Sequence, residues 1–195
     1  MPKHIYSRDG DTGETDLSSG ERVQKISPRV EAYGTVDEFI ASLGVAKIFA
    51  SSRLFTIIED IQKRNYFVAS ELATSGAGHP FKEVEESDTL FVEQLTDDLD
   101  AEMCALGAPV KCFVVPGGTK AAAYLHVART ALRRMERQIL RLAEEEPVNP
   151  ELIKYINRLS DLVFMLARYA NIVDGDGDLC MTRDGTFIQK RLDIE

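Results

Sequence analysis

The chain has 195 residues, of which 44% are hydrophobic and 28% are charged, as in an ordinary globular protein. Its formal net charge of -9 argues against a nucleic-acid-binding surface, because recognition of a phosphate backbone needs a broad basic footprint. No apolar run reaches the roughly 18 residues that span a membrane, and the N-terminus lacks an apolar signal core. We therefore expect a single domain over residues 1–195, located in the cytoplasm, with neither a membrane nor a nucleic acid as partner.

Cysteine usage agrees with that location. Cys104, Cys112 and Cys180 are odd in number and show no Cys-x-x-Cys spacing. This pattern predicts reduced thiols in a reducing compartment.

The chain opens with a segment, residues 5–22, that is rich in Gly, Ser, Thr and Asp and therefore favours turns over a packed core. Its glycines permit close backbone approach, and its hydroxyl and guanidinium groups can donate hydrogen bonds, so it could wrap phosphate oxygens. A flexible tail is the alternative that composition alone favours. No Walker sequence or Gly-x-Gly-x-x-Gly motif occurs, so a bound nucleotide must be held by other means.

Apolar residues recur at alternating spacings of three and four in five later segments, which predicts five helices with buried seams. The expected ranges are 35 to about 49, 52 to 74, 87 or 88 to about 106, 119 to about 146, and 149 to about 171. The fold class is therefore all-α: a five-helix bundle of the ferritin-like up-and-down type with an irregular Gly-rich N-terminal loop. Its core covers about residues 5–171, and residues 172–195 form a tail.

Capping signals support these helix starts. Thr35 and Glu38 have the spacing of a capping box, Thr119 follows a Pro-Gly-Gly break, and Asn149 precedes a first-turn proline. Asn65 interrupts the seam of the second helix, where one buried Asn usually fixes the register.

The fourth helix carries a second stripe beside its seam, formed by His126, Arg129, Arg133 and Arg137, with Glu136 at its edge. Arginines at this spacing repel one another, so something anionic should offset them. Acidic side chains on a neighbouring helix are one answer. A polyphosphate is the other, because a guanidinium group stays charged and can grip two phosphate oxygens at once.

A metal site is not predicted. Residues 174–178 (DGDGD) resemble the start of a calcium loop, but Leu179 and Gly185 occupy positions that need Gly and Glu. The histidines are too scattered for zinc, and no Glu-x-x-His pair suggests a di-iron bundle. His126 alone is more often a half-buried histidine with its hydrogen bonds satisfied than a catalyst.

Four blocks in order resemble the PduO-type ATP:cob(I)alamin adenosyltransferases. They are residues 6–17 (YSRDGDTGETDL), 29–38 (RVEAYGTVDE), 116–137 (PGG, LHVAR and RRMER) and 155–161 (YINRLSD). The departures are small, since Ser7 keeps the hydroxyl of the family's usual Thr and Met135 replaces a common Ala. The tail after Asn171 lies outside the resemblance.

The resemblance implies a homotrimer of five-helix subunits with ATP bound between subunits and the corrinoid in a neighbouring apolar cavity. It implies catalytic roles for Arg133, Asp37 and Glu136, with Asp37 pairing with Arg133 across the interface. The ATP-binding residues that it implies are Ser7, Arg8, Gly10, Asp11, Gly13, Thr15, Lys25, Arg133, Glu136, Arg137 and Asn157. No side chain is expected as a metal ligand, because Mg²⁺ would be held mainly by ATP phosphates.

The implied reaction transfers the 5′-deoxyadenosyl group of ATP to cob(I)alamin, which yields adenosylcobalamin and triphosphate. Cob(I)alamin is itself a strong nucleophile, so the protein needs only to position the carbon and stabilise the departing charge. Expected partners are ATP, cobalamin, a cobalamin reductase and an adenosylcobalamin-dependent enzyme. Two alternatives remain: a non-catalytic trimeric helical scaffold or corrinoid carrier, and a generic bundle whose arginines only pair with Asp and Glu.

Overall fold

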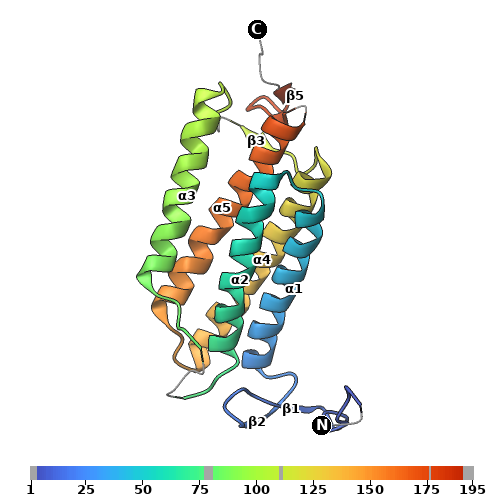
Figure 1. The fold of residues 1–195 in the computed structure, drawn as a ribbon, viewed down its shortest axis with the longest axis vertical. Helices are drawn as coiled ribbons and strands as arrows, with labels where there is room; N and C mark the ends of the chain where they lie inside the picture. The colour runs from blue at the N-terminus through green and yellow to red at the C-terminus, as the bar shows by residue number, and fades with distance from the viewer. Residues whose placement is uncertain (1–3, 77–80, 110–111, 176, 191–195) are drawn as a thin grey trace.

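The computed structural model describes residues 4–76, 81–109, 112–175 and 177–190. The described part contains five long helices, and helices adjacent in sequence run in opposite directions along one bundle (Figure 1). The helices are α1 (Pro28–Ile48), α2 (Ser52–Leu72), α3 (Glu86–Ala105), α4 (Lys120–Glu145) and α5 (Pro150–Asp174). Short strands lie beyond them: β1 (Glu14–Asp16), β2 (Arg22–Gln24), β3 (Phe113–Val114), β4 (Asp178–Met181) and β5 (Phe187–Lys190). The predicted five-helix bundle is confirmed.

The centre of the bundle is α5, which packs against α3, α4 and more weakly α2, while α1 packs against α2 and α4. Every residue from 165 to 172 is buried, so the last turns of α5 are covered on all sides. A helix covered all round belongs in the interior, and this one carries buried polar residues as well as apolar ones. The end of α5 therefore places polar side chains in the interior of the bundle.

The helix starts were predicted correctly at α4 and α5. Thr119 accepts a hydrogen bond from the backbone N–H of Ala122 at 3.1 Å, and Asn149 accepts one from the N–H of Glu151 at 2.9 Å. Asn65 is fully buried and donates to the Tyr155 hydroxyl at 3.2 Å, which links α2 to α5 as a register-fixing Asn would.

The predicted start of the first helix at Thr35 is wrong. The helix begins seven residues earlier at Pro28, capped by Ser27, because a Ser-Pro pair supplies both a cap and a preset first turn. Thr35 lies inside the helix, is 3% exposed and donates its hydroxyl to the Ala32 carbonyl at 2.7 Å. Glu38 does not close a capping box with it and instead pairs with Arg134.

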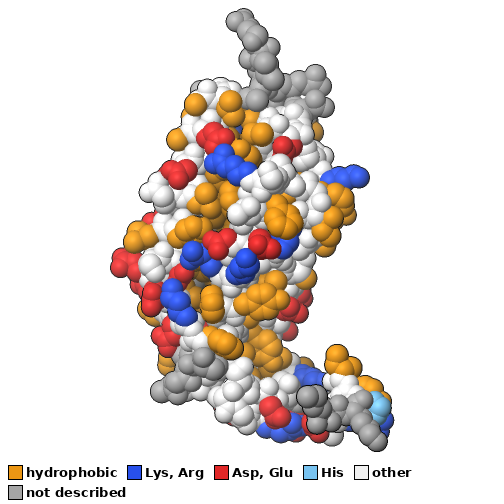
Figure 2. All heavy atoms as spheres, in the orientation of Figure 1, with side chains coloured by type: hydrophobic (Ala, Val, Ile, Leu, Met, Phe, Trp, Pro, Cys, Tyr) orange, Lys and Arg blue, Asp and Glu red, His pale blue; other side chains and the backbone are white. Residues whose placement is uncertain are grey.

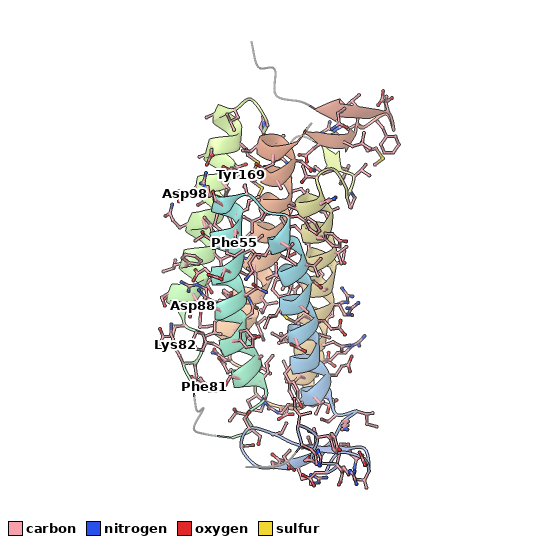
Figure 3. The ribbon with its side chains drawn as sticks, turned by 45° about the vertical axis from the view of Figure 1, so that its right-hand side comes forward. Phe55, Phe81, Lys82, Asp88, Asp98 and Tyr169 are labelled. Atoms are coloured by element: carbon pink, nitrogen blue, oxygen red, sulfur yellow. A yellow bond between two sulfur atoms is a disulfide. The ribbon has the colours of Figure 1, made fainter. Side chains whose placement is uncertain are left out.

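The predicted tail contains ordered structure. Residues 172–174 continue α5, and β4 and β5 form an antiparallel sheet with β3, in the order β3-β4-β5, at the end of the bundle opposite the N-terminal hairpin (Figures 1 and 3). This pairing brings Cys112 and Cys180 to a Cα–Cα distance of 5.6 Å, and they form a disulfide. The prediction of three reduced thiols is therefore wrong for two of them. It failed because the strand pairing joins segments 68 residues apart, and only Cys104 is free and exposed.

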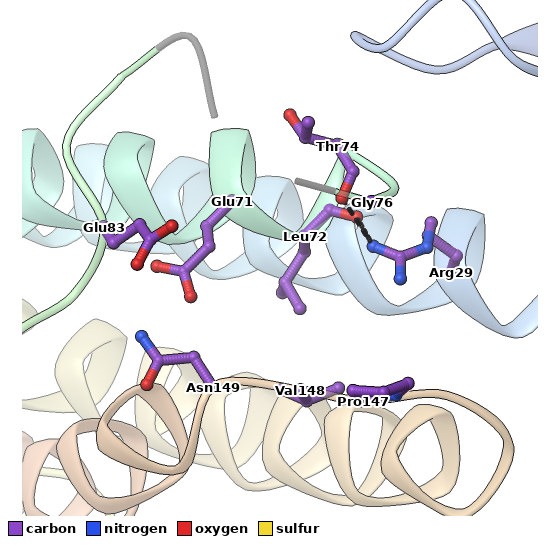
Figure 4. Close-up of a pocket in the computed structure, with 9 residues that line it drawn as sticks. All are labelled: Arg29, Glu71, Leu72, Thr74, Gly76, Glu83, Pro147, Val148 and Asn149. Atoms are coloured by element: carbon purple, nitrogen blue, oxygen red, sulfur yellow. Dashed lines mark hydrogen bonds between the residues drawn. The ribbon is translucent and has the colours of Figure 1, made fainter. Parts of the chain in front are cut away.

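At the end of the bundle near the N-terminal hairpin, the buried Arg29 links three helices (Figure 4). Arg29 Nη1 donates to the carbonyls of Leu72 and Thr74 at 2.8 and 3.0 Å, and its Nη2 pairs with Glu146 at 2.5 Å. These contacts join the start of α1 to the ends of α2 and α4. They line a cavity of about 200 Å³ that also contains the buried Glu71 carboxylate.

The face formed by α1, α2 and α3 shows acidic and basic side chains interspersed with apolar ones (Figure 2). Its charges pair locally: Asp88, at the start of α3, lies 2.6 Å from Arg64 and 3.3 Å from Lys82, and Figure 3 shows Lys82 beside it. This face offers no basic stripe. Among the described helices, none is both long enough and apolar enough to cross a membrane.

Candidate anion-binding site

The predicted stripe on α4 divides into a buried part and an exposed part. His126 is 3% exposed and Arg129 is half-buried, whereas Arg133 and Arg137 are exposed. The first two lie against Phe164 of α5, with the His126 ring 6.3 Å and the Arg129 guanidinium 5.8 Å from the Phe164 ring centre. The stripe therefore begins at the α4–α5 contact and becomes exposed toward the C-terminal end of α4.

Arg133 and Arg137 are not neutralised within the described residues. Arg137 donates to the Arg133 carbonyl at 2.9 Å, and no carboxylate in the described ranges lies within ion-pair distance of either guanidinium. The adjacent Arg134 differs, because it pairs with Glu38 on α1. The alternative that the stripe only pairs with neighbouring acidic side chains is thus not supported for these two residues, which leaves their charge for a group outside the described chain.

Two other predicted site residues meet beside this face. Asn157 of α5 donates to the Glu136 carboxylate of α4 at 2.9 Å. Its carbonyl oxygen accepts a hydrogen bond from Arg158 at 2.9 Å, and Arg158 pairs with Glu93 of α3 at 2.8 Å. The contact between Glu136 and Asn157 is a direct link between α4 and α5 at the level of the arginines.

The Gly-rich N-terminal segment folds into a small hairpin. Lys25 donates its ammonium to the Gly10 carbonyl at 2.7 Å, and a Cβ on Gly10 would lie 2.7 Å from the same nitrogen, so a larger residue there would displace the Lys25 side chain. The backbone of Gly13, at φ 87°, accepts from the Lys25 N–H at 2.9 Å, and Thr15 pairs with Val23 across β1 and β2. The segment is therefore ordered, and the alternative of a flexible tail is not supported over these residues.

The remaining predicted residues of this segment, Ser7, Arg8 and Asp11, are exposed near its tip. Ser7 accepts a hydrogen bond from the Asp9 N–H at 3.3 Å, and Arg8 lies 5.4 Å from the Tyr6 ring centre. No hydrogen bond or ion pair joins described residues 4–25 to Arg133 or Arg137. Lys25 nevertheless lies near the lower half of α4, because it lines one cavity of about 550 Å³ with Gln138 and Arg141.

Asp37 is exposed on α1, and it lines an apolar cavity of about 490 Å³ with Tyr33, Tyr66, Phe67 and Phe81. Within the described residues it forms no ion pair with Arg133. The prediction that this pair forms across a subunit interface concerns two chains and stays a prediction.

His126 corrects one expectation. It is buried rather than half-buried, and within the described residues neither ring nitrogen has a hydrogen-bond partner, so the prediction of a satisfied histidine is wrong. Burial lowers its pKa, the positive charge of Arg129 lowers it further, and Asp178 opposes both. Burial and the neighbouring Arg133 also lower the pKa of Arg129. The region around His126 and Arg129 is therefore desolvated and lies close to positive charge.

Sequence patterns missed the polar residues at the end of α5. Arg168 and Asp178 form a buried ion pair at 2.8 Å, with side chains 3% and 1% exposed, and Asn171 donates to the same Asp178 carboxylate at 3.1 Å. Asp178 lay in the predicted tail, ten residues after Arg168. The only available signal was an Arg and an Asn amid apolar residues in ARYANI.

Two exposed guanidinium groups on one helix have no carboxylate partner in the described ranges, and a Gly-rich hairpin lies beyond the end of that helix, as in a helical-bundle protein built to bind an anion. A family model described as cobalamin adenosyltransferase matches residues 5–170. The chain belongs to this family of transferases.

Individual relatives agree. The corrinoid adenosyltransferase PduO of Salmonella typhimurium is 41% identical over 165 residues, which cover 84% of this chain and 48% of the relative. The corrinoid adenosyltransferase of Citrobacter freundii is 41% identical over 181 residues, which cover 90% of this chain and 98% of the relative. This chain thus spans about half the length of the first relative and nearly all of the second.

Solved structures show the same fold. A variant of the PduO-type ATP:corrinoid adenosyltransferase from Lactobacillus reuteri, complexed with cobalamin and ATP, superposes with a TM-score of 0.84 at 37% identity, covering 95% of this chain and 100% of that one. A second variant from the same organism, complexed with ATP, has a TM-score of 0.76 at 39% identity, covering 86% and 94% of the two chains.

Proposed function

We propose that this protein transfers the 5′-deoxyadenosyl group of ATP to cob(I)alamin, forming adenosylcobalamin and releasing triphosphate. One observation carries the proposal: Arg133 and Arg137 lie exposed on one helix face without a carboxylate partner among the described residues, in a chain of net charge -9. Family membership and relatives complexed with ATP and cobalamin support it.

The reaction assigns a simple task to these side chains. The Co(I) electron pair forms a bond to the ribose C5′, the C5′–O bond breaks, and its electron pair leaves with the triphosphate. Because the nucleophile belongs to the corrinoid, the protein contributes positioning and charge stabilisation. We assign Arg133 and Arg137 to the triphosphate, and Glu136 with Asn157 to the nucleoside and metal region beside it.

Arg133 and Arg137 have no carboxylate partner among the described residues, so their charge is available to ATP held at a contact between subunits. In this proposal the protein is a homotrimer, in which Ser7, Arg8, Gly10, Asp11, Gly13, Thr15 and Lys25 of one subunit enclose the phosphates bound by Arg133 of the next. Asp37 pairs with Arg133 across the same interface. In this proposal residues 1–195 form a single domain, and the assembly is located in the cytoplasm. The enzyme receives reduced cobalamin from a reductase and delivers adenosylcobalamin to an enzyme that depends on it.

The described residues fit Mg²⁺ as an ion carried by ATP. In this proposal phosphate oxygens supply most of the Mg²⁺ ligands, and no side chain of the chain is assigned as a ligand. Bound Mg²⁺ would neutralise phosphate charge, and Glu136, held by Asn157 at 2.9 Å, is the carboxylate that we assign to the metal region.

The test uses purified protein with ATP, Mg²⁺ and chemically reduced cobalamin. We expect a light-sensitive Co–C product spectrum and release of triphosphate. Calorimetric titration with ATP separates the alternatives: a scaffold or carrier without chemistry binds substrate but gives no product, and a bundle with purely structural arginines binds no ATP. Either result would refute the proposal.

A further inference from the structure

The carboxamide of Asn171, near the end of α5, holds the start of α4. Asn171 is 2% exposed, its Oδ1 accepts from the Thr119 N–H at 2.9 Å, and its Nδ2 donates to the Gly117 carbonyl at 3.1 Å. One side chain of α5 thus holds both sides of the Pro-Gly-Gly turn that precedes α4.

The turn lies directly against this side chain. Gly118 has φ 93°, and a Cβ on it would lie 2.0 Å from Asn171 Oδ1, closer than two nonbonded atoms can approach. The contact leaves no room for even one methyl group, so the turn and the carboxamide have a single mutual position.

The C-terminal strands fix the orientation of this carboxamide. Asp178, at the start of β4, accepts a second hydrogen bond from Asn171 Nδ2 at 3.1 Å while it pairs with Arg168 at 2.8 Å. An amide that donates to Asp178 cannot be flipped without placing its oxygen against a carboxylate. The strand is itself held by the bond from the Val115 N–H to the Leu179 carbonyl at 2.8 Å and by the disulfide between Cys112 and Cys180.

Among the described residues, two hydrogen-bonded anchors join α4 and its cap to α5, and the Asn171 contact is one of them. The other is the contact between Glu136 and Asn157, about 25 Å farther along α4 at 1.5 Å per residue. Two anchors at that separation prevent α4 from sliding along α5. Glu136 and Asn157 belong to the ATP site that we propose. The Asn171 anchor, at the other end of α4, therefore influences the position of Glu136 relative to Asn157.

We propose that Asn171, oriented by Asp178, is a positioning residue for the adenosyl transfer: it sets the axial register of α4 against α5 and thereby the placement of Arg133 and Glu136 relative to Asn157. This inference rests on the proposed function. It gives the strands after residue 170, which lie beyond the matched family region, a part in the reaction.

The test compares Asn171→Ala with Asn65→Ala as a matched control. Asn65 is also a buried Asn that links two helices, but its hydrogen bonds among the described residues join α2 to α5 and none goes to α4. For each protein, calorimetry gives the number of ATP sites and the Kd, and steady-state kinetics give kcat and KM. A purely structural residue lowers the number of active sites, whereas a positioning residue changes Kd or kcat at unchanged site number.

We expect Asn171→Ala to keep the site number and to lose about 10- to 100-fold in kcat/KM, the scale for a displacement of about 1 Å at a reacting centre. Asn65→Ala should lower thermal stability but leave kcat/KM per site near wild type. If both variants lose only stability, the inference is wrong. If Asn171→Ala does not fold, Gly118→Ala decides, because its added methyl group forces the turn and the Asn171 carboxamide apart while the Asn171 and Asp178 side chains are both retained. Unchanged kcat/KM per site in Gly118→Ala would overturn the inference.

A separate readout distinguishes failure of this inference from failure of the proposed function. Amide exchange of residues 117–122 should accelerate in Asn171→Ala and not in Asn65→Ala, whatever the wild-type activity. Unchanged exchange there would overturn the anchoring itself. Absence of product with the wild-type protein would instead refute the function.

Discussion

Replacing Asp178 by Asn should cost a large part of the free energy of unfolding. The side chains of Arg168 and Asp178 are 3% and 1% exposed, and they contact at 2.8 Å. Arg168 keeps a further bond to the Ala108 carbonyl at 2.9 Å, but its Nη1 has no partner within the described residues. Asn has nearly the same size, so the substitution removes charge rather than volume and leaves a buried guanidinium uncompensated.

Breaking such a pair from one side typically costs about 3–5 kcal/mol. For a chain of this length, each kcal/mol moves Tm by about 2–4 °C, so Tm should fall by roughly 6–20 °C. Urea denaturation followed by far-ultraviolet circular dichroism, at fixed protein concentration, gives the free energy directly.

The control removes both charges together. Arg168→Met combined with Asp178→Leu eliminates the buried ions and should recover most of the lost stability, because apolar side chains of similar volume avoid the desolvation cost. The exposed pair of Arg134 and Glu38 gives a second control, for which Arg134→Ala should cost less than about 1 kcal/mol. If Asp178→Asn costs under about 1 kcal/mol, or if the double variant is no more stable than it, the interpretation of this pair is refuted.

Three further predictions concern α4 and the turn that precedes it. Arg133→Ala should reduce activity at least ~10²-fold by removing a charge contact in the transition state, while Arg134→Ala should stay near wild type; near-normal turnover of Arg133→Ala in the spectroscopic assay would exclude its role. Because burial lowers the pKa of His126, its contribution to stability is complete above the unfolded value of about 6.5 and is lost as pH falls through the lower folded pKa. Urea midpoints between pH 8 and 5 should therefore fall less steeply for His126→Gln, and equal slopes would count against this assignment. Gly118→Ala should lower the free energy of unfolding by at least about 1 kcal/mol through its positive φ and its contact with Asn171, and an unchanged urea midpoint would contradict that contact.

Local patterns were sufficient where the determinants are close in sequence. The starts of α4 and α5 follow from Thr119 and Asn149, whose capping groups act within three residues. The same reasoning failed at Thr35, because a hydroxyl inside a helix can bond the preceding turn and so resembles a cap in sequence only.

The candidate site shows the same division. Periodicity placed Arg133 and Arg137 on one face of α4, but their exposure and lack of a carboxylate partner in the described chain depend on which helices pack beside that face. His126 belongs to the same sequence stripe yet is buried against α5. The helical repeat determines on which face of α4 a residue lies, but it does not determine which helices pack against that face.

The sequence by itself determined that the chain forms five amphipathic helices, that one carries stacked arginines, and that four ordered blocks resemble a family of adenosyltransferases. The tertiary structure alone decided that Arg168, Asn171 and Asp178 form a buried network, that Cys112 meets Cys180, and that the predicted tail forms part of a sheet. The physical reason is range: periodicity and capping act over a few residues, whereas strand pairing and buried ion pairs depend on contacts that only the folded chain brings together.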